Sequence, residues 1–366
     1  MLPRPRLAIA LGVVALVALA GCTAAPAPAA DSGVVAADPT VPLADLDILA
    51  DPHAYDGPST AVLANAAVPS PAEAPAQQLP ATVTSHDLAG DTSVTVASTE
   101  RILAMDISGS IAATVFGLGF GDSVVGRDVS TTFPGTEGLP VITSSGHTVN
   151  SEAIIALRPT VLITDGSVGP VDVVLQLRDA GIAVVFVDTD PTIAGVGELA
   201  AQVAAALGAP AAGESLANDL GAGIDAKVAE IAAIVPSGKP LRMLFLYLRG
   251  TSGIYYLFGE ESGADVLIRS LGGVDVAAEI GLDGMRPMTD EAMVAANPDL
   301  ILVMTDGIAS VGGVEGLLDS KPAIALTAAG QHKRFVDMAD GEVLAFGPRT
   351  ADVLDALARA IYAPGQ

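Results

Sequence analysis

The stretch PAAGESLANDLGAGIDAKVAEIAAIVP, residues 210–236, decides how the rest of the chain is interpreted. Its apolar residues recur every three or four positions, at Leu216, Leu220, Ile224, Val228, Ile231 and Val235. This spacing is typical of one helix face, and over roughly 20 to 25 residues it amounts to about 30 to 37 Å of helix. Prolines stand near its start and at its end, where a helix is expected to stop. We therefore expect one long helix in the middle of the chain.

On both sides of this stretch, short β-branched runs alternate with amphipathic runs. Before it, RILAMD, TVLITD and AVVFVDTD alternate with GSIAATVFGLGF, SEAIIALR and VDVVLQLRDAG. After it, the alternation begins again at LRMLFLYLR, passes through DLILVMTD and ends in the helical pattern RTADVLDALARAIY. Strands that alternate with helices of this length indicate βαβ units around a mostly parallel sheet. The sequence predicts an α/β fold with an N-terminal lobe at 96–209, a connecting helix at 210–236 and a C-terminal lobe at 237–366.

An internal repeat supports the division into two lobes. SEAIIALRPTVLIT, which begins at Ser151, aligns with DEAMVAANPDLILV, which begins at Asp290, with four identities in fourteen positions. One of these identities pairs Glu152 with Glu291. Each copy predicts a short helix, a proline that ends it, and a strand that runs to a Thr-Asp-Gly sequence. Because the copies occupy equivalent places in the two halves, duplication explains them better than coincidence.

The N-terminus has the layout of an export signal. Two arginines precede an apolar run, residues 7–20, which is too short for a comfortable membrane span. The run ends in LAGC, residues 19–22, which resembles the lipobox of bacterial lipoproteins. That resemblance implies that residues 1–21 are removed and that Cys22 is lipidated, which would attach the exported chain to the outer face of the cytoplasmic membrane.

The residues that follow are rich in alanine, proline and small polar residues. We interpret 22–95 as a lipidated N-terminus and a Pro/Ala-rich stalk between the lipid and the folded body. Cys22 is the only cysteine, so the chain forms no internal disulfide and has no cysteine-based metal site.

The charge balance of the chain is strongly acidic. Lys and Arg number 17 against 42 Asp and Glu, a formal net charge of −25. Without residues 1–21, two arginines and no acid are lost, which leaves 15 basic residues against 42 acidic ones and a charge near −27. Nucleic acid is therefore not an expected partner.

Taken together, these features resemble the helical-backbone, or class III, substrate-binding proteins of ABC importers, which deliver cobalamin, ferric siderophores or haem. The resemblance covers about residues 95–366 and rests on the lipobox, the connecting helix and a Glu-bearing helix followed by proline and a strand in each lobe. It implies two Rossmann-like α/β lobes joined by a single long helix, with the ligand held between them. It also implies a protein that is not an enzyme, and the sequence has no HExxH, GxSxG or phosphate-binding-loop motif.

Within that class, ligands are gripped by loops just before the two Glu-bearing helices and by strand ends of the C-terminal lobe. The first such loop is SSGHTVNSE, which contains His147. The other histidines fall elsewhere: His53 in the N-terminal extension, His86 in a linker and His332 in what looks like a solvated turn. A lone histidine in a loop is more often a surface residue. His147 is a ligand candidate because it lies in the loop where this class grips its ligand.

The stretch LFLYLRG, residues 244–250, ends a strand of the C-terminal lobe with Tyr247 and Arg249. Open α/β sheets place ligands at this end of their strands, although alternation with Met243 and Phe245 also fits a core tyrosine. Residues two apart share one side of a strand, so Arg249 could favour ionisation of the phenol. A contact with a haem propionate and a surface salt bridge are the other roles open to Arg249.

His147, Tyr247 and Arg249 closely resemble the pattern of haem-binding lipoproteins of Gram-positive haem importers, in which one lobe gives a histidine ligand and the other a tyrosine beside an arginine. The resemblance implies that ferric haem is the transported ligand, and phenolate oxygen favours Fe(III). A ferric-siderophore or cobalamin receptor is the alternative. Siderophore binders of this class often use tryptophan, and the chain has none, so the resemblance favours haem. An enzyme or surface adhesin built on the same fold is the other class left open.

Further residues are candidates for lining the pocket. Tyr255 and Tyr256 are neighbours on a strand, so at most one of them faces the ligand. Met285 and Met288 fall in the C-terminal loop that corresponds to the His147 loop, where we expect apolar contacts, and a role as ligands is the other one open to them. Arg286 lies between them and could meet a propionate or remain a surface residue.

The same resemblance implies that one surface glutamate on each lobe docks onto arginines of the permease. The matching residues are Glu152 and Glu291, each of which could instead be a solvated carboxylate at a helix N-terminus. We expect the partners to be the ABC haem permease with its ATPase, haem or haem-carrying surface proteins, and the membrane through the lipid only.

Overall fold

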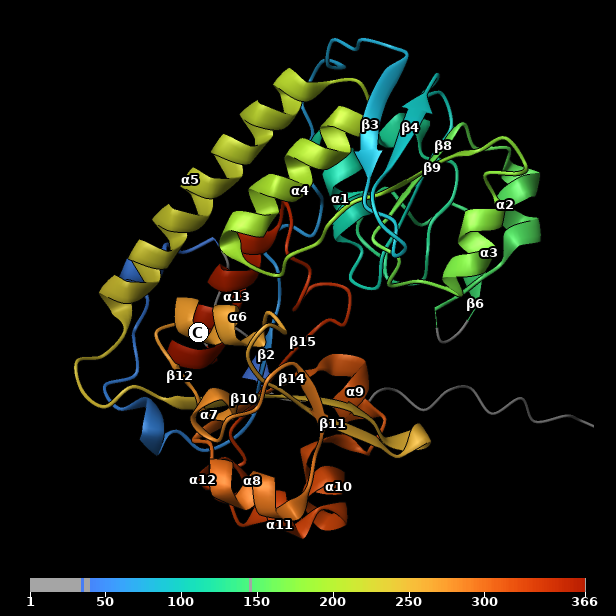
Figure 1. The fold of residues 1–366 in the computed structure, drawn as a ribbon. Helices are drawn as coiled ribbons and strands as arrows, with labels where there is room; N and C mark the ends of the chain where they lie inside the picture. Colours follow the sequence, from blue (N-terminus) through green and yellow to red (C-terminus); the bar gives the residue numbers. More distant parts are fainter. Residues whose placement is uncertain (1–33, 36–39, 145–146, 366) are drawn as a thin grey trace, which may run out of the picture.

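The computed structural model describes residues 34–35, 40–144 and 147–365. The predicted signal peptide and Cys22 lie outside these residues. The described chain forms two lobes, and helix α5, Pro210–Ile234, runs along one side of the molecule from one lobe to the other (Figure 1). This is the helix that the sequence predicts over 210–236.

The N-terminal lobe is built on three parallel strands in the order β5, β8, β9, namely Ile102–Met105, Val161–Thr164 and Ala183–Phe186. Successive residues of a strand point to opposite faces, and both faces are buried: Ile102 belongs to one apolar cluster and Leu103 to another. Burial on both faces explains why these strands read as unbroken apolar runs. The helices of this lobe are α1, Ser110–Gly117; α2, Ser151–Leu157; α3, Val171–Gln176; and α4, Ile193–Ala206.

The C-terminal lobe has a larger, mixed sheet. Its parallel centre consists of β10, β14 and β15, namely Arg242–Arg249, Leu300–Met304 and Phe335–Met338. Two antiparallel strands extend the β10 side, β11 at Ile254–Phe258 and β13 at Met285–Pro287. Helices cover both faces, among them α6, Ala264–Ser270; α8, Asp290–Ala296; and α13, Thr350–Tyr362.

Helix α5 is held by both lobes. It packs along α4 in the N-terminal lobe and along α13 in the C-terminal lobe. Gly213 permits the first contact, because a Cβ at this position would lie 2.5 Å from the Cβ of Ala204. In the second contact Ile224 and Ile231 enter the core of the C-terminal lobe, and Lys227 Nζ lies 2.8 Å from Asp355 Oδ1.

Part of the segment that we interpret as a stalk, 22–95, is folded in the structure. Strand β2, Ser59–Ala61, pairs with β15 in the C-terminal lobe, and in Figure 1 it lies in blue among orange and red strands. Residues 62–80 then cross to the other lobe, where the Gln78 N–H donates to the Gly208 carbonyl at 2.7 Å. The stalk interpretation is therefore wrong for the folded portion, because a Pro/Ala-rich composition does not reveal a three-residue strand whose partner lies far along the chain.

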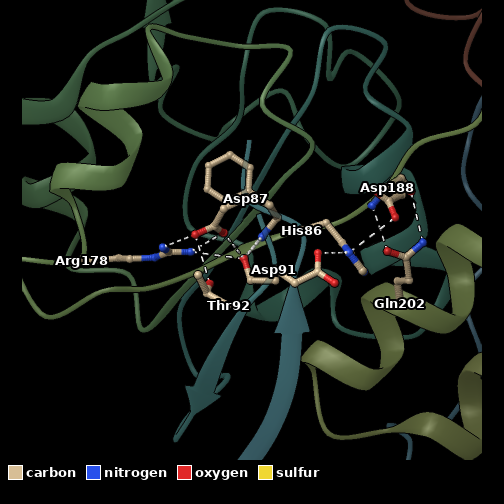
Figure 2. Close-up of polar contacts among 9 residues, drawn as sticks. His86, Asp87, Asp91, Thr92, Arg178, Asp188 and Gln202 are labelled. Carbon is tan, nitrogen blue, oxygen red and sulfur yellow. Dashed lines mark hydrogen bonds and ion pairs between the residues drawn. The ribbon is translucent and has the colours of Figure 1, made fainter. Parts of the chain in front are cut away.

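After the crossing, strands β3 and β4, Ala81–Ser85 and Thr92–Val96, form a hairpin that packs on β9. Asp87 fixes its turn by accepting two hydrogen bonds from Arg178, at 2.6 and 2.8 Å (Figure 2). These bonds lower the pKa of Asp87 to about 2.

His86 belongs to the same hairpin, although the sequence suggested a linker at this position. Its Nδ1 lies 3.0 Å from Asp91 and 3.7 Å from Asp188, and Asp188 is in turn bonded to Gln202 of α4 (Figure 2).

Candidate ligand site between the lobes

The end of β10 carries Tyr247 and Arg249 on one side of the strand. Both side chains are half-buried, unlike the fully buried residues that precede them. The Tyr247 ring stacks on Phe258 with ring centroids 5.7 Å apart and planes 19° apart. Above it, the guanidinium carbon of Arg249 lies 4.6 Å from the ring centroid of Tyr247. The alternation predicted from the sequence therefore brings a phenol and a permanent cation together.

Arg249 is bound by its own lobe. Its Nη1 donates to the Leu248 carbonyl at 2.9 Å, and its Nη2 donates to Asp340 Oδ2 at 2.5 Å. The other oxygen of Asp340 accepts the backbone N–H of Asp306 at 3.0 Å. Burial raises the pKa of Asp340 while the charge of Arg249 opposes that rise. Sequence reasoning missed Asp340, because it lies 91 positions from Arg249 and belongs to no motif.

Strand pairing separates the other candidates between two faces of the sheet. Tyr256 lies opposite Tyr247 in the antiparallel register, and Met285 lies opposite Phe258. Directly opposed residues share a face, so Tyr256 and Met285 are on the Tyr247 side. Met285 is 60% exposed there, as a ligand-contacting residue can be.

The remaining candidates lie on the face of the sheet opposite to Tyr247. Tyr255 pairs with Leu248 and packs into the cluster beneath α8, with Lys321 Nζ 4.0 Å from its ring centroid. Arg286 pairs with Leu257 on the same side, and Met288 packs into the same cluster. The sequence could not assign these faces, because they depend on the register between β10, β11 and β13.

His147 approaches from the N-terminal lobe. Its backbone is left-handed, with φ at 60°, and its half-buried side chain has an Nδ1 atom without a hydrogen-bond partner among the described residues, which exclude its neighbours 145–146. Burial lowers the pKa of His147, and the charge of Arg249 in the other lobe lowers it further. Arg249 of the C-terminal lobe is thus the charged group that disfavours protonation of this imidazole.

The other histidines have polar partners. His53 Nε2 lies 3.0 Å from the Lys239 carbonyl, and His332 Nδ1 lies 2.7 Å from Asp56. Together with the hairpin contacts of His86, these bonds account for three histidines as structural or surface groups. Within the part of the chain that the structure describes, His147 is the histidine with a buried nitrogen that lacks a hydrogen-bond partner.

The N-terminal lobe also contains a buried carboxylate pair that the sequence did not suggest. Asp106 follows β5 and accepts the N–H groups of Ser110 and Ile111 at the start of α1, both at 3.0 Å. Asp128 accepts the Asp106 N–H at 3.0 Å. Burial, helped by the charge of Asp128, raises the pKa of Asp106 to about 6. These bonds hold the loop at the end of β5 rather than present a free reactive group.

A family model described as periplasmic binding protein matches residues 107–340. The chain belongs to the periplasmic binding protein family. Its two lobes and single connecting helix are those of the class III members. It is therefore a substrate-binding protein and not an enzyme, and proteins of this kind are exported and serve a permease and its ATPase.

Solved structures with the same fold include several heme-binding proteins. The heme-binding protein HmuT is 38% identical, with a TM-score of 0.80 over 86% of this chain and 99% of that one. The periplasmic heme-binding protein RhuT from Roseiflexus sp. RS-1 is 36% identical, with a TM-score of 0.66 over 74% of this chain and 100% of that one.

A curated relative is YvrC of Bacillus subtilis (strain 168), an uncharacterized ABC transporter substrate-binding lipoprotein. It is 28% identical over 251 residues, which are 68% of this chain and 76% of YvrC. Among the described residues, no helix is both long and apolar enough to cross a bilayer.

Proposed function

We propose that this protein captures ferric haem between its lobes, with His147 and Tyr247 as axial ligands and Arg249 supporting the phenolate, and delivers it to an ABC permease. The observation that carries the proposal is the placement of Arg249. Its guanidinium lies over the Tyr247 ring, with its central carbon 4.6 Å from the ring centroid, and the lowered pKa of His147, to which the charge of Arg249 contributes, is consistent with this placement.

The spacing of these residues supports the assignment. Solved structures of HmuT include alanine variants at one histidine, one tyrosine and one arginine. In HmuT that tyrosine follows the histidine by 99 positions, and the arginine follows the tyrosine by two. In this chain Tyr247 follows His147 by 100 positions, and Arg249 again follows by two.

The chemistry of the two ligands suits ferric iron. A phenol ionises near pH 10 in water, so a phenolate ligand at neutral pH benefits from both the iron and a neighbouring cation. An imidazole must be neutral to bind iron, and the lowered pKa of His147 favours that form. Among the described residues no group binds its buried Nδ1, so this atom is not committed to a hydrogen bond within that part of the protein.

The face around Tyr247 supplies an apolar wall for a porphyrin. Tyr256, Phe258 and Met285 share this face through the strand register. Aromatic and thioether side chains give broad contact area with few polar demands. The proposed lining therefore consists of Tyr256 and Met285, with the buried Phe258 stacked against Tyr247 in the core, and without Tyr255, Arg286 or Met288.

The proposed docking surface consists of two matched helices, α2 and α8. Each has seven residues and is preceded by a capping residue whose side chain accepts a backbone N–H of the first turn. Asn150 accepts the Ala153 N–H at 3.0 Å, and Thr289 accepts the Ala292 N–H at 3.1 Å. Each also exposes a glutamate and, three positions later, an aliphatic residue: Glu152 with Ile155 at 49% exposure, and Glu291 with Val294 at 48%. Two such patches, one per lobe, fit a permease that presents a cation and an apolar contact twice.

Charge reversal tests this docking. Glu152→Lys and Glu291→Lys should each reduce haem transfer to the permease in proteoliposomes and leave haem affinity unchanged. Glu214→Lys, on the exposed face of α5, is the matched control. Equal transfer by all three variants would remove the docking role.

The proposed location follows from the N-terminal sequence. Lipidation at Cys22 would attach the exported protein to the outer face of the cytoplasmic membrane, where it would receive haem directly or from haem-carrying surface proteins. Metabolic labelling with a radioactive fatty acid tests this, because Cys22→Ser should abolish the label.

The ligand is tested by titrating purified protein with ferric haem, a ferric siderophore and cobalamin. We expect a saturable Soret change with haem only, and its loss in the double variant His147→Ala with Tyr247→Ala. His332→Ala, at an exposed histidine, should bind as the unaltered protein does. Binding of the siderophore or cobalamin without haem would replace the proposed cargo, and haem binding that survives in the double variant would refute the ligand assignment.

A further inference from the structure

We propose that Asp340 is a positioning residue of this site, which holds Arg249 over Tyr247 and keeps it from turning toward a carboxylate of the ligand. The inference rests on the proposed function, and it chooses among the roles of Arg249 that the sequence left open. In the sequence Arg249 could support the tyrosine, bind a propionate or form a surface salt bridge. In the structure the salt bridge to Asp340 fixes Arg249 beside Tyr247, so the salt-bridge role and the tyrosine-supporting role occur together.

Both terminal nitrogens of Arg249 have partners. Nη1 is bound to the backbone carbonyl of Leu248, and Nη2 is bound to Asp340 and lies 3.7 Å from Met304 Sδ. The two charged side chains are 30% and 24% exposed, so water competes with the ion pair only in part. A guanidinium bound at both ends is fixed in position, and here its central carbon lies 4.6 Å from the centroid of the phenol ring.

Asp340 is itself held from several sides. Its Oδ1 accepts the Asp306 N–H, which leaves Oδ2 directed to Arg249. The next residue, Gly341, abuts the other lobe, because a Cβ there would lie 2.6 Å from Thr132 Oγ1. The buried Arg349 donates to the Gly341 carbonyl at 3.1 Å. The backbone next to Asp340 is therefore held between the two lobes, and this limits the movement of the carboxylate that binds Arg249.

The sign of the electrostatic effect separates positioning from a simple charge effect. Asp340 is anionic, so by charge alone it opposes the formation of a phenolate at Tyr247. If Arg249 stayed in place, removal of this carboxylate would make the phenolate more stable. If Asp340 positions Arg249, its removal lets the cation leave and makes the phenolate less stable. The two possibilities predict opposite shifts.

The first measurement examines Arg249 directly in the ligand-free protein. Hindered rotation of a bound guanidinium gives separate NMR signals for its Nη protons, and Arg249→Ala assigns them by their loss. We expect the separate signals to merge in Asp340→Asn and to persist in Asp306→Asn. The second variant removes an exposed neighbouring charge and keeps the backbone N–H that Asp340 uses. Signals that persist in Asp340→Asn would overturn the proposal, whether or not the protein binds haem.

The second measurement follows the haem complex on acidification, as protonation of the phenolate ends the tyrosine spectrum. We expect Asp340→Asn to move this transition to higher pH and to weaken haem affinity about tenfold, as outer-shell partners of metal ligands do. In the double variant Asp340→Asn with Arg249→Ala, the loss of haem affinity should be no greater than for Arg249→Ala alone. A transition at lower pH, or additive losses, would show that Asp340 acts by charge or by stability. No haem spectrum in the unaltered protein would refute the proposed function and leave the first measurement to decide the role of Asp340.

Discussion

The two halves of the proposed site are held in different ways. The tyrosine half, Tyr247 with Arg249 and Asp340, is bound by a stacked ring, an ion pair and a backbone N–H. The histidine half is His147, on a left-handed backbone and with a buried nitrogen that has no hydrogen-bond partner in the described ranges 34–35, 40–144 and 147–365. If the proposed site is right, the tyrosine half is already positioned in the ligand-free protein, and the histidine half becomes positioned when haem binds.

Removal of the phenol oxygen should have the largest effect. Tyr247→Phe keeps the ring that stacks on Phe258 and deletes only the ligand atom. Because outer-shell partners already change metal affinity by about 10- to 100-fold, we expect a loss of at least about 100-fold in haem affinity. Absorbance titration against ferric haem measures it. If Tyr247→Phe reduced haem affinity less than His147→Ala does, the histidine half would contribute more to binding than the tyrosine half, which is the reverse of our expectation.

His147→Ala should have a smaller effect. The histidine half contributes few contacts of its own, so we expect about a tenfold loss of affinity, the lower end of the same range. The haem spectrum should change to that of a five-coordinate ferric complex with tyrosine still bound. Resonance Raman spectroscopy distinguishes five- from six-coordinate haem, and loss of the tyrosinate signal in this variant would contradict the division into two halves.

The pH behaviour of His147 tests the link between the halves. Burial lowers its pKa and so does the charge of Arg249, so Arg249→Gln should raise the pKa of His147 toward its ordinary value. The neutral form that binds iron would then be lost at higher pH on acidification. NMR titration of the imidazole in the ligand-free protein measures the shift, with Arg249→Lys as the variant that keeps a charge. An unchanged or lower pKa in Arg249→Gln would show that the halves do not share one space.

Loss of the ion pair between Asp87 of the β3–β4 hairpin and Arg178 should have the smallest effect on haem binding. Asp87→Asn removes the ion pair with Arg178 far from the tyrosine half, so haem affinity should not change. The folded pKa of Asp87, about 2, lies below its unfolded value of 3.8, so its stabilisation is complete above pH 4 and disappears as the pH falls to about 2. At neutral pH the variant should lose on the order of 1 to 2 kcal/mol of unfolding free energy.

Urea denaturation of the two proteins, at pH 7 and near pH 2, measures this difference. Equal stabilities at pH 7 would mean that the Asp87–Arg178 pair contributes nothing. A loss of haem affinity would mean that the hairpin helps to place the histidine half.

Local patterns were sufficient to predict much of the fold. The three-to-four spacing of residues 210–236 predicted α5, and continuous apolar runs predicted β8 and β10, because helix and strand periods are properties of neighbouring residues. The same reasoning placed Tyr247 and Arg249 on one side of a strand, and the contact between them agrees with it.

What the sequence could not provide depends on distant pairing. The register of β11 against β10 decides that Tyr256, and not Tyr255, lies beside Tyr247, and register is set by the folded sheet. Asp340 reaches Arg249 across 91 positions, so no local motif announces it. The strand at Ser59–Ala61 is too short to have a reliable pattern, and only its partner β15 makes it a strand.

That strand has a consequence for the order in which the molecule can be assembled. Thr60 bonds to Asp337, 277 residues later, so β2 is synthesised long before the strand it joins. The N-terminal lobe has its central strands complete by Phe186, whereas the C-terminal lobe needs a segment from the beginning of the chain and one from near its end. Because the N-terminus of the chain emerges first, the histidine half can form first and the tyrosine half last. Capacity to hold the ligand is then reached only when nearly the whole chain has been translocated.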